Sequence, residues 1–451
     1  MQKKQSNRKM KRYSREIMII LIVILSRLPF IFNSLGSDLD AWREVYTGKI
    51  LSENHLYNVS RFPGYPFPEF LYALVYNKPY WCINLFSVLF TVGCCLYFFR
   101  ILEFLKMKFS FFTSIVFSFI PIIYINSTVA MEYNWSLFFV LGSVYYLLKK
   151  NFWISALFFG LIVSTRFNNI IFLPALLSLA YFQTGKELKK TVQFLLLSFL
   201  FTGIFFSPVL LKYRLNFFLH SGNSEFNLAS LLSLGTLYVY GALGVLAIAS
   251  ALVIQFFTGG YQKAKELYRN HFMVFCVIMI VLNLAFFIKY PLEAGYLIPS
   301  VPFVLIFLQH ILNERLMKFV LVSLFLSPFL IHLNTANIQI KGSLFANEDY
   351  EDQELKYCNE LVSKIKHLSG NRLTVFHLGN YTEQVILMGN FNTKSGIRIV
   401  KNLSRADEDA ILNKGYKLYY INTGDGTIEN NKTHIIDQHG ILLHGNFELR
   451  K

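Results

Sequence analysis

The sequence has little charge and few of the motifs found in soluble enzymes. Only 16% of its 451 residues are charged, whereas soluble domains carry about 25%. The five cysteines lack the spacing of a zinc site or a disulfide framework, and no two histidines have the spacing of metal ligands. Internal repeats and low-complexity segments are also missing. These absences argue against a disulfide-rich secreted domain and against a zinc enzyme with a standard motif.

The chain is instead rich in long apolar runs. Hydrophobic residues make up 54% of it, and its mean hydropathy is +0.42. A helix needs about 20 apolar residues to cross the hydrocarbon layer, and continuous runs favour helices over barrel strands. The sequence therefore predicts a polytopic α-helical membrane protein. About eleven spans are expected, at 17–33, 81–99, 109–125, 135–148, 152–165, 168–182, 191–210, 229–257, 272–288, 296–312 and 317–333.

Charged residues between these runs predict the orientation, because Lys and Arg favour the cytoplasmic side. With the basic segment 1–16 inside, the loops on that side hold 20 Lys and Arg, and the opposite loops hold 8. Topology thus accounts for the net charge of +16, and we do not expect nucleic-acid binding. The pattern predicts a cytoplasmic N-terminus and an outward C-terminus.

Two outward regions stand apart within or after the predicted helical module 17–335. The first is the long loop 34–80, which mixes charged and aromatic residues and contains a turn-forming segment at 61–68. The second is the polar tail 340–451. Expected strands at 372–378, 397–401 and 417–421 alternate there with helices at 351–368 and 406–414. This alternation predicts a small extracytoplasmic α/β domain.

The outer loop begins with two carboxylates, Asp38 and Asp40, close to the predicted membrane surface. Such a pair could hold Mg²⁺ or Mn²⁺ through hard oxygen ligands, or one carboxylate could act as a general base. Alternatively, the pair only caps the following helix, because Asp is common at helix N-termini.

Further polar residues lie at the outer ends of the predicted spans. Cations there could bind a lipid phosphate, which arginine holds with two parallel hydrogen bonds. Alternatively, they only anchor helix ends at the interface. Arg166 lies in a very short turn, which favours a functional role. The candidate substrate-binding residues are Arg61, Tyr65, Glu132, Arg166, Lys212, Lys289, Glu293 and Tyr296.

Four ordered segments resemble the GT-C glycosyltransferases, in particular the protein O-mannosyltransferase and aminoarabinose-transferase type. They are Asp38-Leu39-Asp40, Phe62-Pro63-Gly64-Tyr65-Pro66, residues 160–166 followed by Pro174, and residues 291–299. The resemblance covers roughly residues 15–312. Family members often have adjacent Asp and Glu in the first loop, whereas Leu39 separates the two carboxylates here.

The resemblance implies an inverting transfer of a sugar from a polyprenyl-phosphate donor to an acceptor that could be a lipid, a glycan or a protein. It implies that Asp38 is the base and Asp40 its partner. Basic residues would stabilise the charge of the leaving phosphate. Arg166 matches the family's motif best, followed by Arg61, Lys212 and Lys289.

Other functions stay open at this point. A lipid flippase or transporter would place charged residues or broken helices near the bilayer midplane, and we predict no charged residue at mid-span and no inverted halves. A polyprenyl-linked ligase would concentrate polar residues in a late outer loop, and a scaffold would need no acidic first loop. The Lys-, Asn-, Ile- and Phe-rich composition indicates a bacterial source. We therefore expect an inner-membrane protein of the cell envelope whose partners are the lipid-linked donor and membrane lipids.

Overall fold

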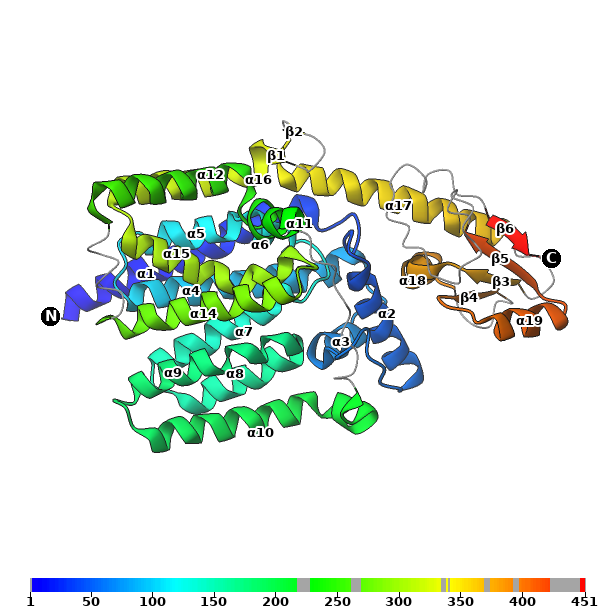
Figure 1. Cartoon of the computed structure of the whole chain (residues 1–451), viewed down its shortest axis with the longest axis horizontal. Helices are drawn as coiled ribbons and strands as arrows, with labels where there is room; N and C mark the ends of the chain where they lie inside the picture. The colour runs from blue at the N-terminus through cyan, green and yellow to red at the C-terminus, as the bar shows by residue number, and fades with distance from the viewer. Residues whose placement is uncertain are drawn as a thin grey trace. The chain divides into compact units, whose positions relative to one another are not determined.

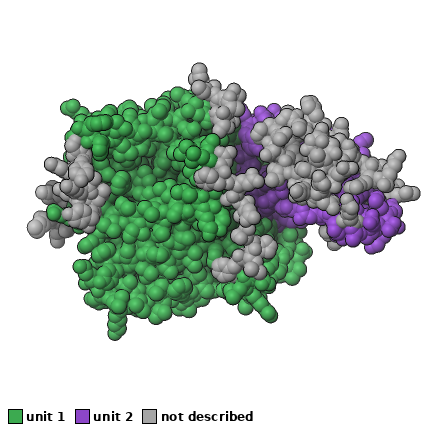
Figure 2. Space-filling view, in the orientation of Figure 1, with its two compact units in different colours: residues 1–35, 47–348 green, residues 36–46, 349–451 purple. Residues whose placement is uncertain are grey.

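The computed structural model describes residues 2–216, 228–260, 269–333, 338–339, 341–368, 374–391, 397–421 and 447–450. The chain divides into two compact units, which Figure 2 colours separately. The first comprises residues 1–35 and 47–348, and the second comprises residues 36–46 and 349–451. The segment 36–46, which opens the predicted outer loop, therefore belongs to the same unit as the C-terminal residues.

The first unit is built almost entirely of helices (Figure 1). Each predicted span coincides with one helix or with a run of consecutive helices. The elements are α1 (Gln2–Arg27), η1 (Leu28–Phe30), α3 (Pro66–Ala73), α4 (Tyr80–Phe104), α5 (Ser110–Phe119), α6 (Pro121–Ile125), α7 (Tyr133–Leu148), α8 (Phe152–Thr165), η2 (Phe167–Phe172), α9 (Leu173–Gln183), α10 (Leu188–Tyr213), α11 (Leu228–Leu232), η4 (Ser233–Leu237), α12 (Tyr238–Gln255), η5 (Phe256–Gly260), α14 (His271–Lys289), η7 (Ala294–Ser300), α15 (Val301–Ile311), α16 (Glu314–Leu330) and the short strands β1 (His332–Leu333) and β2 (Ile338–Gln339).

Two predicted spans are interrupted for local reasons. Between α5 and α6, Ile120 takes an extended conformation (φ −59°, ψ 130°), because the following Pro121 disfavours helical geometry at the residue before it. Within α12, Gly241 has a φ of 68°. A side chain there would place its Cβ 2.1 Å from Ser327 Oγ of α16. Glycine thus allows both the break and the close approach of the two helices.

Among the described residues, five helices are long and apolar enough to cross a membrane. They are Tyr80–Phe104, Leu188–Tyr213, Leu228–Thr258, His271–Lys289 and Ala294–Ile311. On α10, the side chains of Leu196, Phe199, Leu200, Ile204 and Leu211 are each more than half exposed. A continuous apolar face of this kind suits a lipid environment, where it needs no protein cover.

The second unit is a small α/β arrangement, as the alternation of expected strands and helices predicts. Strands β3 (Thr374–His377), β4 (Ile397–Val400), β5 (Lys417–Ile421) and β6 (Phe447–Arg450) form a sheet in the order β4-β3-β5-β6. β3 is parallel to β4 and β5, and β6 is antiparallel to β5. The helices are α17 (Ser343–Leu368), α18 (Thr382–Gly389) after η8 (Gly379–Tyr381), and α19 (Arg405–Asn413).

The core of the second unit forms where α17 packs on the sheet. Leu361 and Ile365 of α17 are one helical turn apart and are buried with Phe376 of β3 and Tyr419 of β5. Leu39, from the first turn of α2 (Leu39–Asn54), packs against the same cluster. This contact explains why residues 36–46 group with the C-terminal residues.

Candidate active site

The loop that carries Arg61 is shaped by a close packing at Gly64, in the first unit. Phe62-Pro63 is a cis peptide, and Gly64 follows it with a φ of +105°. A Cβ at Gly64 would lie 2.7 Å from a Val59 methyl and 2.8 Å from a Val209 methyl. Only glycine fits this conformation and this space. The chain then turns directly into α3, with Tyr65 as its N-cap residue.

Glu69, in the first turn of α3, holds the residues that precede Arg61. Its buried carboxylate accepts hydrogen bonds from the Tyr57 hydroxyl (2.6 Å), the Ser60 amide (2.7 Å) and the Ser60 hydroxyl (2.8 Å). Burial raises the pKa of Glu69 above its usual 4.5, while these hydrogen bonds and the charge of Arg61 lower it in part. Burial and the neighbouring Glu69 also raise the pKa of Tyr57.

Glu132 joins two arginines from separate segments. It is fully buried at the residue before α7, and its Oε1 atom accepts hydrogen bonds from Arg61 Nη2 (2.8 Å) and from Arg166 Nη1. Arg61 comes from the loop before α3, and Arg166 is the residue that ends α8. One carboxylate therefore faces two guanidinium groups, and charge-assisted hydrogen bonds of this kind are among the strongest in proteins.

We call Arg61, Glu132 and Arg166 the arginine cluster. Tyrosine rings surround it. The Arg166 guanidinium carbon lies 3.7 Å from the centre of the Tyr133 ring, 5.4 Å from that of Tyr296 and 5.7 Å from that of Tyr65. Arg61 lies 4.2 Å from the centre of the Tyr65 ring. A cation over an aromatic face gains about 2 kcal/mol when both are desolvated. The rings thus hold both arginines in place.

Two buried polar atoms of the cluster have no hydrogen-bond partner among the described residues. They are the Oε2 atom of Glu132 and the hydroxyl of Tyr133. A cavity of about 10 Å³ lies beside Tyr133, Arg166 and Tyr296, which is room for about one water molecule. Buried polar atoms are normally hydrogen-bonded, and the cavity beside Tyr133 has the size of the water that would satisfy such an atom.

The turn after α14 supplies Tyr296 and is flanked by two further predicted residues. Lys289 is the exposed last residue of α14, with its ammonium nitrogen 5.2 Å from the centre of the Tyr290 ring. Glu293 precedes η7, and its carbonyl accepts a hydrogen bond from the Tyr296 amide (3.3 Å). Asn283 of α14 donates to the Tyr296 carbonyl (2.8 Å). The structure therefore brings Tyr296 to the arginine cluster and places Lys289 and Glu293 on the turn that carries it.

Lys212 contacts the loop that precedes Arg61. Near the end of α10, its ammonium group donates to the Tyr57 carbonyl and to the Asn58 side chain. Lys212 and Glu69 thus both hold the loop that precedes Arg61. Of the ten predicted residues, Arg61, Tyr65, Glu132, Arg166 and Tyr296 are the ones in contact within the arginine cluster.

Asp38 and Asp40 lie in the second unit at the start of α2. Asp38 Oδ1 accepts a hydrogen bond from the Asp40 amide (2.8 Å), and the Asp38 carbonyl accepts one from Ala41 (3.1 Å). Asp38 therefore caps the helix, as the structural interpretation of this motif expects. Asp40 Oδ1 lies 2.7 Å from Arg43 Nη1, and Arg43 also donates to the Asn380 side chain (3.1 Å). In the part of the chain that the structure describes, no group of three or more His, Cys, Asp or Glu side chains gathers as at a metal site.

Arg27 lies near the middle of the predicted span 17–33, where no charged residue was expected. It is fully buried on the last turn of α1 and donates to Ser127 Oγ (3.0 Å) and to the Ser118 carbonyl. Its guanidinium carbon lies 4.0 Å from the centre of the Tyr124 ring. These hydrogen bonds connect α1 to α5 and to the segment that leads to Glu132, so Arg27 stabilises the packing of the first unit.

Comparison with solved structures identifies the fold. The crystal structure of ArnT from Cupriavidus metallidurans bound to undecaprenyl phosphate matches with a TM-score of 0.58 and 11% identity, over 92% of this chain and 93% of that chain. This chain therefore shares the fold of ArnT, which is a GT-C glycosyltransferase. The apo oligosaccharyltransferase of Archaeoglobus fulgidus, a second GT-C protein, matches with a TM-score of 0.52 and 11% identity, over 91% and 69% of the two chains. No family model and no curated protein matches the sequence. The resemblance seen in the four sequence segments is confirmed at the level of the GT-C fold.

Proposed function

We propose that this protein is an inverting glycosyltransferase that transfers a sugar from a polyprenyl phosphate to an acceptor. The observation that carries the proposal is the arginine cluster within a GT-C fold. Two guanidinium groups with one carboxylate leave a net positive charge, which suits a phosphate leaving group. The ArnT structure with undecaprenyl phosphate supports a lipid of this class. The acceptor is a lipid, a glycan or a protein.

Exposure assigns different tasks to the two arginines. The Arg61 side chain is 17% exposed, whereas that of Arg166 is 5% exposed. Arg61 therefore contacts the lipid phosphate, because it can donate to a ligand without leaving Glu132. Arg166 lies among the tyrosine rings and holds Glu132, which in turn orients Arg61. Tyr65 lies under Arg61 and supports its orientation, and Lys289 and Glu293 support the turn that carries Tyr296.

The reaction proceeds with Asp38 as the general base. Asp38 takes the proton of the acceptor hydroxyl while the acceptor oxygen bonds to the anomeric carbon. The bond between that carbon and the phosphate oxygen breaks, and its electron pair leaves with the polyprenyl phosphate. Attack opposite to the leaving group inverts the anomeric carbon. Asp40, paired with Arg43, keeps the start of α2 in position for Asp38.

Asp38 and Asp40 also offer the carboxylate oxygens that a divalent cation binds. Mg²⁺ is commonly held by one or two carboxylates, with water and substrate phosphate completing its six ligands. Mg²⁺ or Mn²⁺ bound by these two side chains would supply positive charge to the donor phosphate.

The predicted topology is part of the same proposal. Eleven spans with a cytoplasmic N-terminus would place loop 34–80 and the domain 340–451 outside the cytoplasm, at the surface of a bacterial inner membrane. A lipid-linked donor presents its sugar at the membrane surface, and this agrees with an active site on the outer side of the membrane. The domain 340–451 on the same side would bind the acceptor. The flippase alternative receives no support from the matched structures.

The test is transfer by the purified full-length protein. Release of polyprenyl phosphate is measured with a panel of radiolabelled polyprenyl-phosphate sugars for wild type, Arg61→Gln and Lys78→Gln. Lys78 is an exposed cation of the same loop and serves as the matched control. We expect Arg61→Gln to lower kcat about 100-fold, the effect of removing one donor to a developing charge, and Lys78→Gln to be unchanged. Binding of donors without release by wild type would contradict the enzyme assignment.

A further inference from the structure

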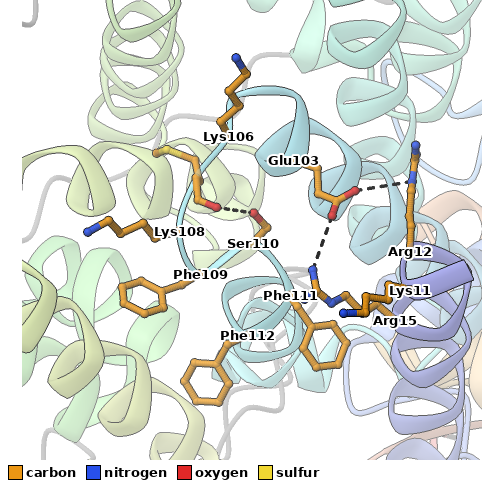
Figure 3. Close-up of a pocket in the computed structure, with 11 residues that line it drawn as sticks. Lys11, Arg12, Arg15, Glu103, Lys106, Lys108, Phe109, Ser110, Phe111 and Phe112 are labelled. Atoms are coloured by element: carbon orange, nitrogen blue, oxygen red, sulfur yellow. Dashed lines mark hydrogen bonds and ion pairs between the residues drawn. The ribbon is translucent and has the colours of Figure 1, made fainter. Parts of the chain in front are cut away.

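A second charged site lies in the first unit, away from the arginine cluster. A pocket of about 750 Å³ forms between the N-terminal part of α1 and the turn from α4 to α5. Lys11, Arg12 and Arg15 of α1 line one side of it, and Lys106 and Lys108 of the turn line the other, with their side chains extending away from the arginines (Figure 3). α1 begins at one end of the helical unit, and α3, which follows Arg61, lies at the other end (Figure 1).

The positive charge of this pocket is only partly neutralised. Glu103 is the single carboxylate in its lining, and it lies 3.6 Å from Arg12 and 3.8 Å from Arg15. Lys108 lies 3.5 Å from Glu314, which also pairs with Lys318. Among the described residues, the structure gives no ion pair for Lys11 or Lys106, and both are exposed. The pocket therefore holds an excess of cations that an anion would neutralise.

The ion pairs that do form give the pocket a defined wall. Glu16 of α1 accepts from Arg12 (3.2 Å) and from Arg100 of α4 (3.0 Å). Together with Glu103, it holds the basic turn of α1 against α4. Arg12 and Arg15 are thereby held at the wall of the pocket.

Apolar side chains adjoin the cations in the pocket. Phe111 and Phe112 line it, and Phe112 is 39% exposed. A ligand that places a phosphate among the cations would have its apolar part beside these side chains. This combination selects a phospholipid over a water-soluble phosphate, because basic pockets between membrane helices bind anionic headgroups.

We propose that this pocket binds the phosphate headgroup of an anionic phospholipid, with the acyl chains lying beside Phe111 and Phe112. The site is independent of the transfer reaction. Its ligand anchors the N-terminal end of the helical unit in the leaflet opposite to the proposed active site.

The full-length protein in nonionic detergent is titrated with phosphatidylglycerol or phosphatidylcholine, and bound lipid is counted by native mass spectrometry. The pocket variant carries Arg15→Gln, Lys106→Gln and Lys108→Gln. The control carries Lys150→Gln, Lys186→Gln and Lys189→Gln, which removes three exposed cations: one from the turn between α7 and α8, one from the turn between α9 and α10, and one from the start of α10. Melting temperatures verify folding, and the single variant Lys106→Gln replaces the pocket variant if the latter is unstable.

Wild type is expected to bind phosphatidylglycerol more tightly than phosphatidylcholine. Each lost cation weakens the phosphatidylglycerol Kd roughly fivefold, so the pocket variant loses about 100-fold, and the control keeps wild-type affinity. Equal affinity of wild type and pocket variant overturns the proposal, as does an equal loss in the control. Displacement of the lipid by an equal concentration of inorganic phosphate would identify a soluble phosphate site instead.

Discussion

The guanidinium carbon of Arg166 lies over the ring of Tyr133, 3.7 Å from its centre. The Tyr133 hydroxyl has no hydrogen-bond partner among the described residues, so the ring face is the part of this side chain that holds Arg166. Because Arg166 in turn holds Glu132, and Glu132 holds Arg61, the ring sits at the base of a chain of contacts that ends at the proposed phosphate-binding residue.

Replacing the Tyr133 ring is therefore expected to weaken catalysis, whereas removing its hydroxyl is not. We expect Tyr133→Leu to lower kcat roughly tenfold, since about 1–2 kcal/mol of cation–π contact is lost. Tyr133→Phe should keep wild-type kcat. Steady-state transfer assays compare both with Tyr145→Leu, a change on the opposite end of the same helix. Equal losses in the Leu and Phe variants would show that the hydroxyl matters instead.

Gly295 provides a test of packing at the same ring. A Cβ at this position would lie 2.5 Å from a ring carbon of Tyr133. The same ring is packed against Arg166. We expect Gly295→Ala to destabilise the protein by about 1–3 kcal/mol and to lower transfer. Gly203→Ala is the matched control, since nothing lies within 4 Å of its Cβ and it sits inside α10. Its melting temperature should be unchanged or higher. A tolerated Gly295→Ala would mean that the Tyr133 ring moves freely.

The sequence predicts much of this site because polar residues at the ends of apolar runs are rare. Glu132 and Arg166 could each be found in this way, whereas Arg61 could be found as a cation of the first outer loop, and the contacts in the structure join the three. Their pairing could not be predicted, because it depends on how helices rotate and pack against one another. Tyr133 follows Glu132 in the chain, yet an aromatic residue at a helix start has no special signal. Arg27 did have a signal, as a lone arginine within an apolar run.

Some of the fold was also predictable from local sequence patterns. The strands β3, β4 and β5 fall within the runs of β-branched and aromatic residues that predict them. The grouping of residues 36–46 with residues 349–451 was not, since it rests on the contact of Leu39 with a core more than 300 positions away in the chain. Contacts of such separation leave no local pattern.

Glu69 is expected to make stability depend on pH. Its folded-state pKa is raised by burial above the usual value of 4.5, so the folded state holds the proton more tightly than the unfolded state. The stabilisation is fully present below pH 4.5 and is lost as the pH rises through the folded-state pKa. Glu69→Gln, which mimics the protonated form, should flatten this dependence. Melting temperatures between pH 4 and 8 test this, with exposed Glu187→Gln as control. A wild-type curve that rises over this range would contradict the expectation.

Cation binding by the acidic pair has a direct test. Isothermal titration of the full-length protein with Mn²⁺ should show binding that the double variant Asp38→Asn, Asp40→Asn loses, because carboxylate oxygens are the ligands this ion prefers. Chelation should lower transfer in wild type, and added Mg²⁺ should restore it. A control with Asp409→Asn in the second unit removes an exposed carboxylate elsewhere. Unchanged Mn²⁺ binding in the double variant would assign the ion to another place.

The two interpretations of Asp38 make different predictions for two substitutions. Asn caps a helix as well as Asp does, whereas Ala costs about 1 kcal/mol at this position. If Asp38 is the base, Asp38→Asn keeps the wild-type melting temperature but lowers kcat about 100-fold or more, and Asp38→Ala lowers both. If Asp38 only caps α2 through its bond to the Asp40 amide, Asp38→Asn stays fully active and Asp38→Ala loses stability alone. We expect the first pattern, because a base must accept a proton, and the neutral amide of Asn accepts none near pH 7.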